Sequence, residues 1–170
     1  MIEKIFRTYL EIKSINDLNE VKKPEENYSI NLVDPIDFQL NKFFYKQIGK
    51  KYFWKDRLEW SNKTWIEYVS DKKLSTYVLK NNEEIVGYFE LIFHKTEAEA
   101  EIAYFGILED YFGKKLGGYL LSQAIKKSFQ LNIKRVWLHT CSLDHKNALK
   151  NYLSRGMAIF KSEILKTKIA

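Results

Sequence analysis

The sequence predicts a single mixed α/β domain over residues 1–170, and three observations support that prediction. The length of 170 residues is close to one ordinary domain and is enough to bury a core. The middle of the chain consists of apolar segments between polar turns, as in an antiparallel meander. After about residue 117, helical and strand-like segments alternate, which favours helices packed on a sheet.

The first part of the chain contains two strand-like segments. Residues 2–13 are apolar enough to form a strand, and residues 14–27 are polar and predict a loop. Residues 28–33 alternate apolar and polar side chains between Pro24 and Pro35, which predicts a short strand.

Two helices are expected next. The first covers residues 37–48, and Gly49 is well placed to end it. Ser61 is a good N-cap for the second, which runs to Val69. The apolar residues at helical spacing are Leu40, Phe44 and Ile48 in the first helix, and Trp65, Ile66 and Val69 in the second.

A meander of strands follows the helices. Residues 76–80 and 85–93 flank the polar stretch 81–84, which predicts a hairpin. A second polar turn, residues 95–98, precedes a third strand at residues 101–108.

The last part of the chain alternates helix and strand. Helical spacing of apolar residues predicts a helix over about residues 117–130, and residues 135–139 resemble a buried strand. A short helix is expected over about residues 146–155, with Gly156 as its stop, and residues 160–168 predict a last strand.

The composition predicts a globular protein of the cytoplasm. Hydrophobic residues make up 45% of the chain and charged residues 29%, which is typical of globular proteins. Cys141 is the only cysteine, so no intramolecular disulfide forms, and no Cys or His cluster has zinc spacing. No apolar run approaches the roughly 18 residues of a membrane span, and residues 1–7 lack the apolar core of a signal peptide. We therefore expect no metal, no membrane insertion and no secretion.

The net charge of +6 is spread along the chain. Lysines are scattered, and like charges occur in pairs such as Lys22-Lys23 rather than in longer blocks. A basic surface suits an anionic cofactor as well as nucleic acid. Because no concentrated basic patch is evident, we expect no nucleic-acid partner, and a nucleic-acid-binding domain is the weakest alternative.

Residues 112–118 form a glycine-bearing turn between a predicted strand and a predicted helix. The first N–H groups of a helix have no partner within it, and with the helix dipole they attract anions. Gly113, Gly117 and Gly118 allow close approach to the backbone, and Lys114 and Lys115 add positive charge. The turn therefore predicts an anion site, although an ordinary strand–helix connection has the same pattern.

This turn resembles the pyrophosphate loop of the GNAT superfamily of acetyl-CoA-dependent N-acetyltransferases. The family pattern is Gln/Arg-x-x-Gly-x-Gly/Ala after its fourth strand. The final Gly117-Gly118 agrees with it, whereas Phe112 replaces Gln/Arg and Lys115 replaces the first glycine. Lys115 is a significant departure if that position requires a positive φ.

A second block, after the strand at residues 135–139, strengthens the resemblance. The family usually has Asn-x-x-Ala-x-x-x-Tyr-x-x-x-Gly-Phe there. Ala148, Tyr152 and Gly156 agree with that pattern, while His145 replaces Asn and Met157 replaces Phe. The resemblance covers residues 75–160, and the N-terminal third agrees only in its pattern of a strand and two helices.

The resemblance implies a mostly antiparallel central sheet with helices on both faces. It also implies transfer of acetyl from acetyl-CoA, as co-substrate, to a primary amine of a small molecule by direct attack. A protein lysine or N-terminal acetyltransferase is one alternative, and a non-catalytic acyl-CoA-binding sensor is another. Related proteins are often dimers, so a homodimer is possible.

The resemblance also assigns roles to individual residues. Tyr152 is expected to protonate the leaving thiolate, and Glu101, or a water relay, is expected to deprotonate the amine. Strict strand alternation places Glu101, Ala103, Phe105 and Ile107 on one face. The residues expected at the cofactor are Ile107, Leu108, Phe112, Gly113, Lys114, Lys115, Leu116, Gly117, Gly118, His145 and Asn147. Within this set, the backbone N–H of Ile107 or Leu108 is expected to polarise the thioester carbonyl.

Two further groups of residues have weaker functional interpretations. His139 and His145 flank Cys141, a pattern that an acyl-enzyme mechanism would use, but we favour His139 as a polar residue near the acceptor. The rings of Trp54, Trp60 and Trp65 are candidates for the acceptor pocket, and core packing is the alternative.

Overall fold

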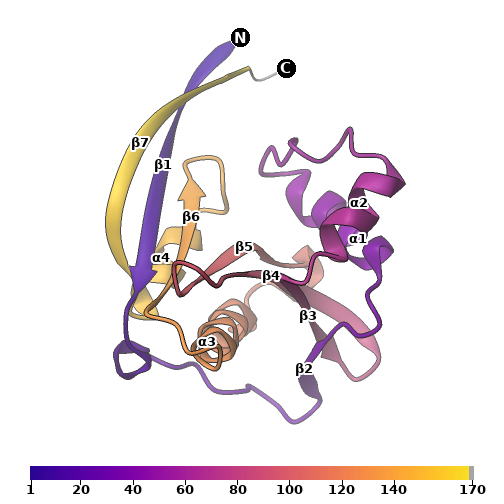
Figure 1. Ribbon diagram of the computed structural model, residues 1–170, viewed down its shortest axis with the longest axis vertical. Coiled ribbons are helices and arrows are strands. Elements are labelled where there is room, and N and C mark those ends of the chain that lie inside the picture. The colour runs from indigo at the N-terminus through magenta and orange to yellow at the C-terminus, as the bar shows by residue number, and fades with distance from the viewer. Residues whose placement is uncertain (169–170) are drawn as a thin grey trace.

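A twisted sheet of seven strands organises the molecule, with helices on both of its faces (Figure 1). The computed structural model describes residues 1–168. The strand order is β2-β3-β4-β5-β6-β1-β7, and all neighbours are antiparallel except the parallel pair β5 and β6. The mixed, mostly antiparallel architecture expected from the sequence is confirmed. The strands are β1 (Ile2–Ile12), β2 (Tyr28–Leu32), β3 (Leu74–Asn81), β4 (Glu84–His94), β5 (Glu99–Ile107), β6 (Arg135–Cys141) and β7 (Ala158–Lys168), and the α-helices are α1 (Phe38–Gly49), α2 (Asn62–Val69), α3 (Leu116–Phe129) and α4 (Ala148–Ser154).

Local signals in the sequence set the starts of α1 and α2. The side chain of Asp37 caps α1 by accepting from the N–H of Gln39, and that of Ser61 caps α2 by accepting from the N–H of Thr64. Helix α4 begins at Ala148, slightly later than expected. His145 Nδ1 accepts a hydrogen bond of 3.0 Å from the N–H of Asn147, which holds the preceding residues in a turn instead.

The N-terminal strand β1 lies inside the sheet, between β6 and β7, and pairs with both. The antiparallel pair of β1 and β7 extends well beyond the rest of the sheet, so the start of β1 and the end of β7 project on the same side (Figure 1). The sequence predicts a strand at this position in the chain but not its neighbours, because pairing over more than a hundred residues leaves no local signal.

Strands β5 and β6 separate soon after they pair. Their register covers only Glu99–Glu101 opposite Arg135–Trp137. Beyond those residues the two strands splay apart, and the gap between them opens toward the C-terminal ends of both strands.

A β-bulge in β5 corrects the expected side-chain pattern of that strand. Tyr104 lies opposite Glu90 and Ile102 lies opposite Leu91, so Ala103 is an extra residue without a partner on β4. One extra residue shifts the alternation by one position. Strict alternation was therefore the wrong prediction: Glu101 and Tyr104 face α1 and α2, whereas Phe105 and Ile107 face α3.

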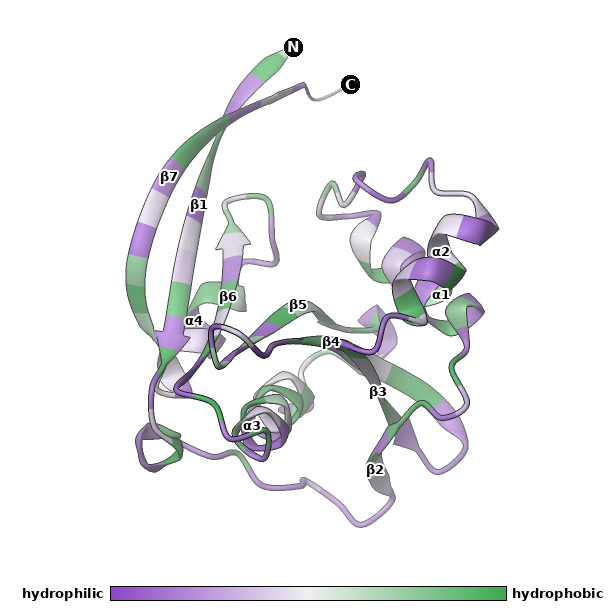
Figure 2. Cartoon of the chain, viewed as in Figure 1, coloured by the Kyte–Doolittle hydropathy of each residue, from purple (hydrophilic) through white to green (hydrophobic). Residues whose placement is uncertain are grey.

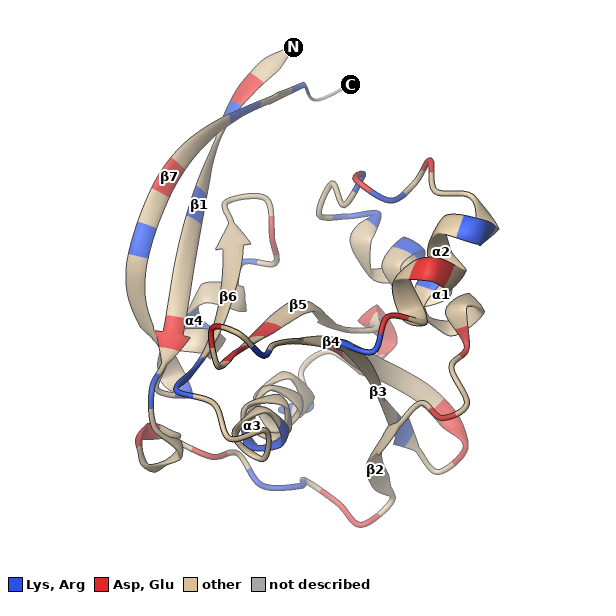
Figure 3. Ribbon diagram, viewed as in Figure 1, with Lys and Arg blue, Asp and Glu red and all other residues tan. Residues whose placement is uncertain are grey.

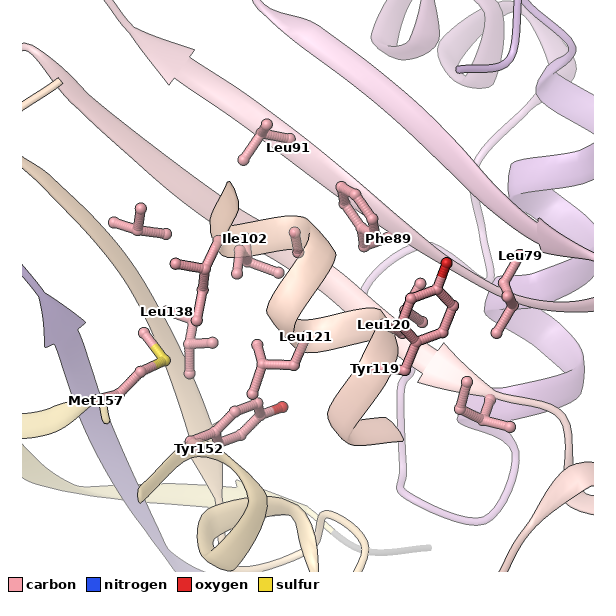
Figure 4. Close-up of a cluster of buried hydrophobic side chains, with 14 of the residues drawn as sticks. Leu79, Phe89, Leu91, Ile102, Tyr119, Leu120, Leu121, Leu138, Tyr152 and Met157 are labelled. Atoms are coloured by element: carbon pink, nitrogen blue, oxygen red, sulfur yellow. The ribbon is translucent and has the colours of Figure 1, made fainter. Parts of the chain in front are cut away.

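Two apolar layers cover the faces of the sheet. The larger lies under α3, where Leu120, Leu121 and Ile125 are fully buried. Figure 4 shows Leu120 and Leu121 in this layer, and Figure 2 shows hydrophobic residues along α3. The smaller lies under α1, where the rings of Phe44 and Tyr88 stack with centroids 4.7 Å apart. Burial of these side chains supplies most of the driving force for folding.

A buried ion pair joins the segment between α1 and α2 to the sheet. Glu90 of β4 is 0% exposed, and its Oε1 lies 3.0 Å from Nη1 of Arg57. The hydroxyl of Tyr68 and the amide of Asn41 also donate to this carboxylate, at 2.7 and 2.9 Å. The Arg57 guanidinium is 4.2 Å from the centroid of Tyr104. Burial is the largest single effect and lowers the pKa of Arg57. Glu90 and the neighbouring hydroxyls of Tyr68, Tyr104 and Tyr88 together outweigh burial, so the net shift of this pKa is upward.

We predict that Glu90→Gln lowers the free energy of unfolding by about 3–5 kcal/mol, because it leaves the buried Arg57 without a counter-charge. Denaturant titration measures the loss. Glu67→Gln is the matched control, since Glu67 pairs with Lys63 on the exposed face of α2 at 4.0 Å and such pairs contribute about 0–1 kcal/mol. Equal effects of the two substitutions would contradict the prediction.

Candidate active site

A cavity of about 1300 Å³ occupies the gap where β5 and β6 diverge. Both strands line it, together with the turn before α3, the inner side of α4 and the connection between α1 and α2. The ends of β1 and β7 complete its wall through Ile5, Arg7 and Leu165. The cavity therefore runs from the start of α3 to the open face of the sheet.

The turn before α3 forms the first end of the cavity. The first intrahelical bond runs from the N–H of Tyr119 to the carbonyl of Lys115, at 3.3 Å. The N–H groups of Leu116, Gly117 and Gly118 precede it and so have no acceptor within the helix. Gly113 has φ 80° and Lys115 has φ 62°, which turn the chain so that these donors border the cavity. This arrangement can hold an anion.

Tyr152 lies in the middle of the cavity wall, on α4. It is 8% exposed, packs edge-on against Phe105 with ring centroids 6.3 Å apart, and lies beside Leu121 (Figure 4). Burial, and then the charge of Asp144, raises the pKa of its hydroxyl. The hydroxyl makes no hydrogen bond within residues 1–168, so it is free to bond to a ligand.

Glu101 and His94 form a pair on the open face of the sheet. Glu101 Oε1 lies 3.0 Å from Nε2 of His94, and the imidazole stacks on Trp137 with centroids 6.2 Å apart. The Glu101 side chain is 18% exposed and borders the cavity. Sequence reasoning missed His94, because its contact with Glu101 depends on the register across the β4–β5 hairpin.

The end of β6 holds His139 and Cys141, and the loop after it holds His145, but not in an acyl-enzyme arrangement. Burial, and then Asp144, raises the pKa of the Cys141 thiol, which disfavours the thiolate. Partial burial, and then the charge of Arg7, lowers the pKa of His139. The ring centroid of His139 lies 5.4 Å from that of Tyr9, and His139 lines the cavity.

His145 lies at the mouth of the cavity between two aromatic rings. Its ring centroid is 5.1 Å from that of Phe112 and 6.0 Å from that of Tyr52, and both contacts are edge-on. The turn before α3, the loop before α4 and the α1–α2 connection therefore meet at one point. Tyr52 carried no functional signal in the sequence.

Most of the residues expected at the site line the cavity, and a few do not. Leu108 lies outside it, and its N–H donates to the carbonyl of Val86 at 2.8 Å. Lys114 also lies outside, with its ammonium 5.1 Å from the ring centroid of Tyr111. Trp54 borders the cavity, whereas Trp65 is 1% exposed in the core. The expected residues that do line it are Glu101, Ile107, Phe112, Gly113, Lys115, Leu116, Gly117, Gly118, His145, Asn147 and Tyr152.

Three wider features bear on the class of site. Among residues 1–168, no group of three or more His, Cys, Asp or Glu side chains could hold a metal ion. Over the same residues, no helix is long and apolar enough to cross a membrane. Basic and acidic positions are interspersed along the described chain (Figure 3).

Comparisons with known proteins identify the family and the fold. A family model described as Acetyltransferase (GNAT) family matches residues 38–157. No curated protein sequence matches the chain. Among solved structures, a GCN5-related N-acetyltransferase from Kribbella flavida is similar with TM-score 0.65 and 14% identity, over 97% of this chain and 58% of that one. A GCN5-related N-acetyltransferase from Sphaerobacter thermophilus has TM-score 0.68 and 15% identity, over 96% of this chain and 51% of that one.

A third similar structure is an aminoglycoside acetyltransferase from an uncultured soil metagenomic sample. It has TM-score 0.65 and 12% identity, and the match covers 78% of this chain and 90% of that one. The first two proteins are much longer than this chain, which spans 58% and 51% of their lengths. At these identities the structural matches establish the fold alone.

We predict that Lys115→Gly raises the free energy of unfolding by about 1 kcal/mol, because a side chain at positive φ is strained and glycine is not. Lys114→Gly is the control at the adjacent position, where φ is not positive, and it should be neutral or destabilising. Denaturant titration compares the two. A loss of stability in Lys115→Gly as large as that in Lys114→Gly would contradict the prediction.

Proposed function

The chain belongs to the GNAT acetyltransferase family, and on that premise we propose that it transfers acetyl from acetyl-CoA to a primary amine of a small molecule. The observation that supports this proposal is the composition of one cavity. An anion site at the start of α3, a protonated Tyr152 and the Glu101–His94 pair all border it. These are the groups that acyl transfer to an amine requires.

The residues present fit the phosphates of acetyl-CoA, which supplies the activated acetyl group when bound. Leu116, Gly117 and Gly118 line the cavity, their N–H groups have no acceptor within α3, and Lys115 adds a positive charge beside them. Asn151 donates to the carbonyl of Gly117 at 3.1 Å, which fixes α4 against this turn. The turn and α4 would hold the nucleotide end of the molecule.

A backbone donor in β5 is available for a carbonyl oxygen. The Leu108 N–H is already bonded to Val86 of β4. Donors alternate in direction along a strand, so the N–H of Ile107 points away from β4 and into the gap beside β6. We therefore assign the oxyanion donor to Ile107 and not to Leu108.

In this proposal Tyr152 donates a proton and Glu101 accepts one. Because burial raises the pKa of Tyr152, its hydroxyl keeps its proton at neutral pH and can supply it to a leaving thiolate. Glu101 is placed to accept a proton from the attacking amine, directly or through a water. His94, bonded to Glu101, orients the carboxylate.

The walls of the cavity favour a small acceptor over a protein chain. Lys55 Nζ, on the α1–α2 connection, donates to the carbonyl of Lys168 at the end of β7, at 2.6 Å. This contact bridges the open side of the cleft and restricts the approach of a bulky segment. The aminoglycoside acetyltransferase among the similar structures is consistent with a small amine acceptor. A non-catalytic sensor would bind acetyl-CoA without needing Tyr152 or Glu101.

We predict that Tyr152→Phe lowers kcat about 10²-fold and leaves the Kd for CoA unchanged, because only the proton donor is lost. The substitution keeps the ring and removes no hydrogen bond within residues 1–168. Turnover of acetyl-CoA over a panel of amines, with calorimetry of CoA binding, measures both quantities. Absence of CoA binding by the wild-type protein would disprove the proposed function, and binding without turnover would favour the sensor.

We predict that Glu101→Gln lowers kcat/KM at least about tenfold at neutral pH and that raising the pH reduces the defect. An aliphatic amine with a pKa of about 10 is increasingly neutral at higher pH and then needs no base. Glu99→Gln is the control: Glu99 lies two residues away on the same strand and pairs with Arg135 at 2.8 Å. A defect independent of pH, or an equal one in Glu99→Gln, would contradict the assignment.

A further inference from the structure

Arg155, the residue after the end of α4, is a cation without a carboxylate partner within residues 1–168. Its Nη1 lies 3.3 Å from Oδ1 of Asn151, a neutral acceptor. Its Nε is buried and has no hydrogen-bond partner in the same described chain. Arg155 borders the cavity. The Arg155 side chain as a whole is partly exposed, so only Nε loses hydration without regaining a hydrogen bond from the described chain. This unpaired donor at the edge of a cavity indicates a binding partner outside the chain.

Gly118 makes room for this guanidinium at the start of α3. A Cβ added to Gly118 would lie 2.4 Å from Nη1 of Arg155 and 2.9 Å from Cγ2 of Val21. Glycine inside a helix costs about 1 kcal/mol relative to alanine. Its presence in the first turn of α3 lets the Arg155 side chain reach the backbone, close to the free N–H groups.

Asn151 connects the guanidinium to the same turn. Its Nδ2 donates to the carbonyl of Gly117 at 3.1 Å, and its Oδ1 accepts from Arg155. One amide therefore fixes both the helix start and the orientation of the arginine. The backbone of Arg155 has a separate role, since its carbonyl accepts from the N–H of Asn19 at 2.9 Å. A substitution of the side chain leaves that backbone bond in place.

We propose that the Arg155 guanidinium binds a phosphate group of acetyl-CoA, together with the N–H groups at the start of α3. The assignment rests on the proposed function, because it adds a residue to the same cofactor site. A planar guanidinium and unpaired backbone donors are the groups that phosphate oxygens prefer. Acetyl-CoA carries phosphate as a pyrophosphate and as a 3′-phosphate, and the chemistry of Arg155 suits both.

Calorimetry with CoA and with dephospho-CoA, which lacks the 3′-phosphate, tests the assignment in the full chain. Arg155→Met should weaken CoA binding about 10-fold to 100-fold, as expected for one charge-assisted contact. An equal loss with dephospho-CoA identifies the pyrophosphate as the partner, and a loss confined to CoA identifies the 3′-phosphate. Lys150→Met is the matched control, because Lys150 is an exposed cation on α4 outside the cavity.

The salt dependence of binding separates an ionic contact from a structural role. Loss of an ionic contact to phosphate should make the Kd for CoA less sensitive to salt, whereas a packing defect should leave that sensitivity unchanged. Arg155→Lys, which keeps the charge, should recover part of the affinity. An unchanged Kd in Arg155→Met, or a weaker Kd with unchanged salt sensitivity, would overturn the assignment while leaving the proposed function intact. Absence of CoA binding by the wild-type protein would overturn both.

Discussion

The early separation of β5 and β6 is the constraint on which the rest of the molecule depends. Parallel neighbours in a sheet normally continue to pair, but these two share register only over Glu99–Glu101 and Arg135–Trp137. The bulge at Ala103 follows immediately and bends β5 away. Backbone groups on the facing edges are then free of sheet bonds, so a buried cavity with its own polar lining can form inside the sheet.

The gap between β5 and β6 has to be stabilised from both faces of the sheet. A different interaction does this on each face. On one side, α3 and α4 bury an apolar layer against the strands, with Tyr152 part of that layer. On the other side, the buried pair of Arg57 and Glu90 fastens the α1–α2 connection to β4. Arg57 and Tyr104 also border the cavity, so the stability of this face and the shape of the proposed acceptor end are linked. A substitution in the ion pair should therefore change the free energy of unfolding and the shape of the cavity.

Local sequence signals predicted the helices and the turn before α3, whereas features set by distant pairing could not be predicted. Caps at Asp37 and Ser61 depend on residues within one turn, and the expected helices were confirmed. The bulge at Ala103 depends on how β5 registers with β4, so the predicted face of Phe105 was wrong. The position of β1 between β6 and β7 and the contact of His94 with Glu101 likewise depend on strand register.

The two ends of the cavity also differ in whether their residues are close together or far apart in the sequence. The proposed phosphate end is built from one turn and the adjoining helix, within the region that the family model matches. The proposed acceptor end takes Ile5 and Arg7 from β1 and Leu165 from β7, and both strands lie outside residues 38–157. Under the proposed function, family-wide features can therefore account for how the donor is held, but not for which acceptor binds. Arg7 brings a cation to that wall, and its Nη1 lies 3.7 Å from Oε1 of Glu163 on β7. Under the proposed function, the choice of acceptor should therefore depend on the charges that both β1 and β7 contribute.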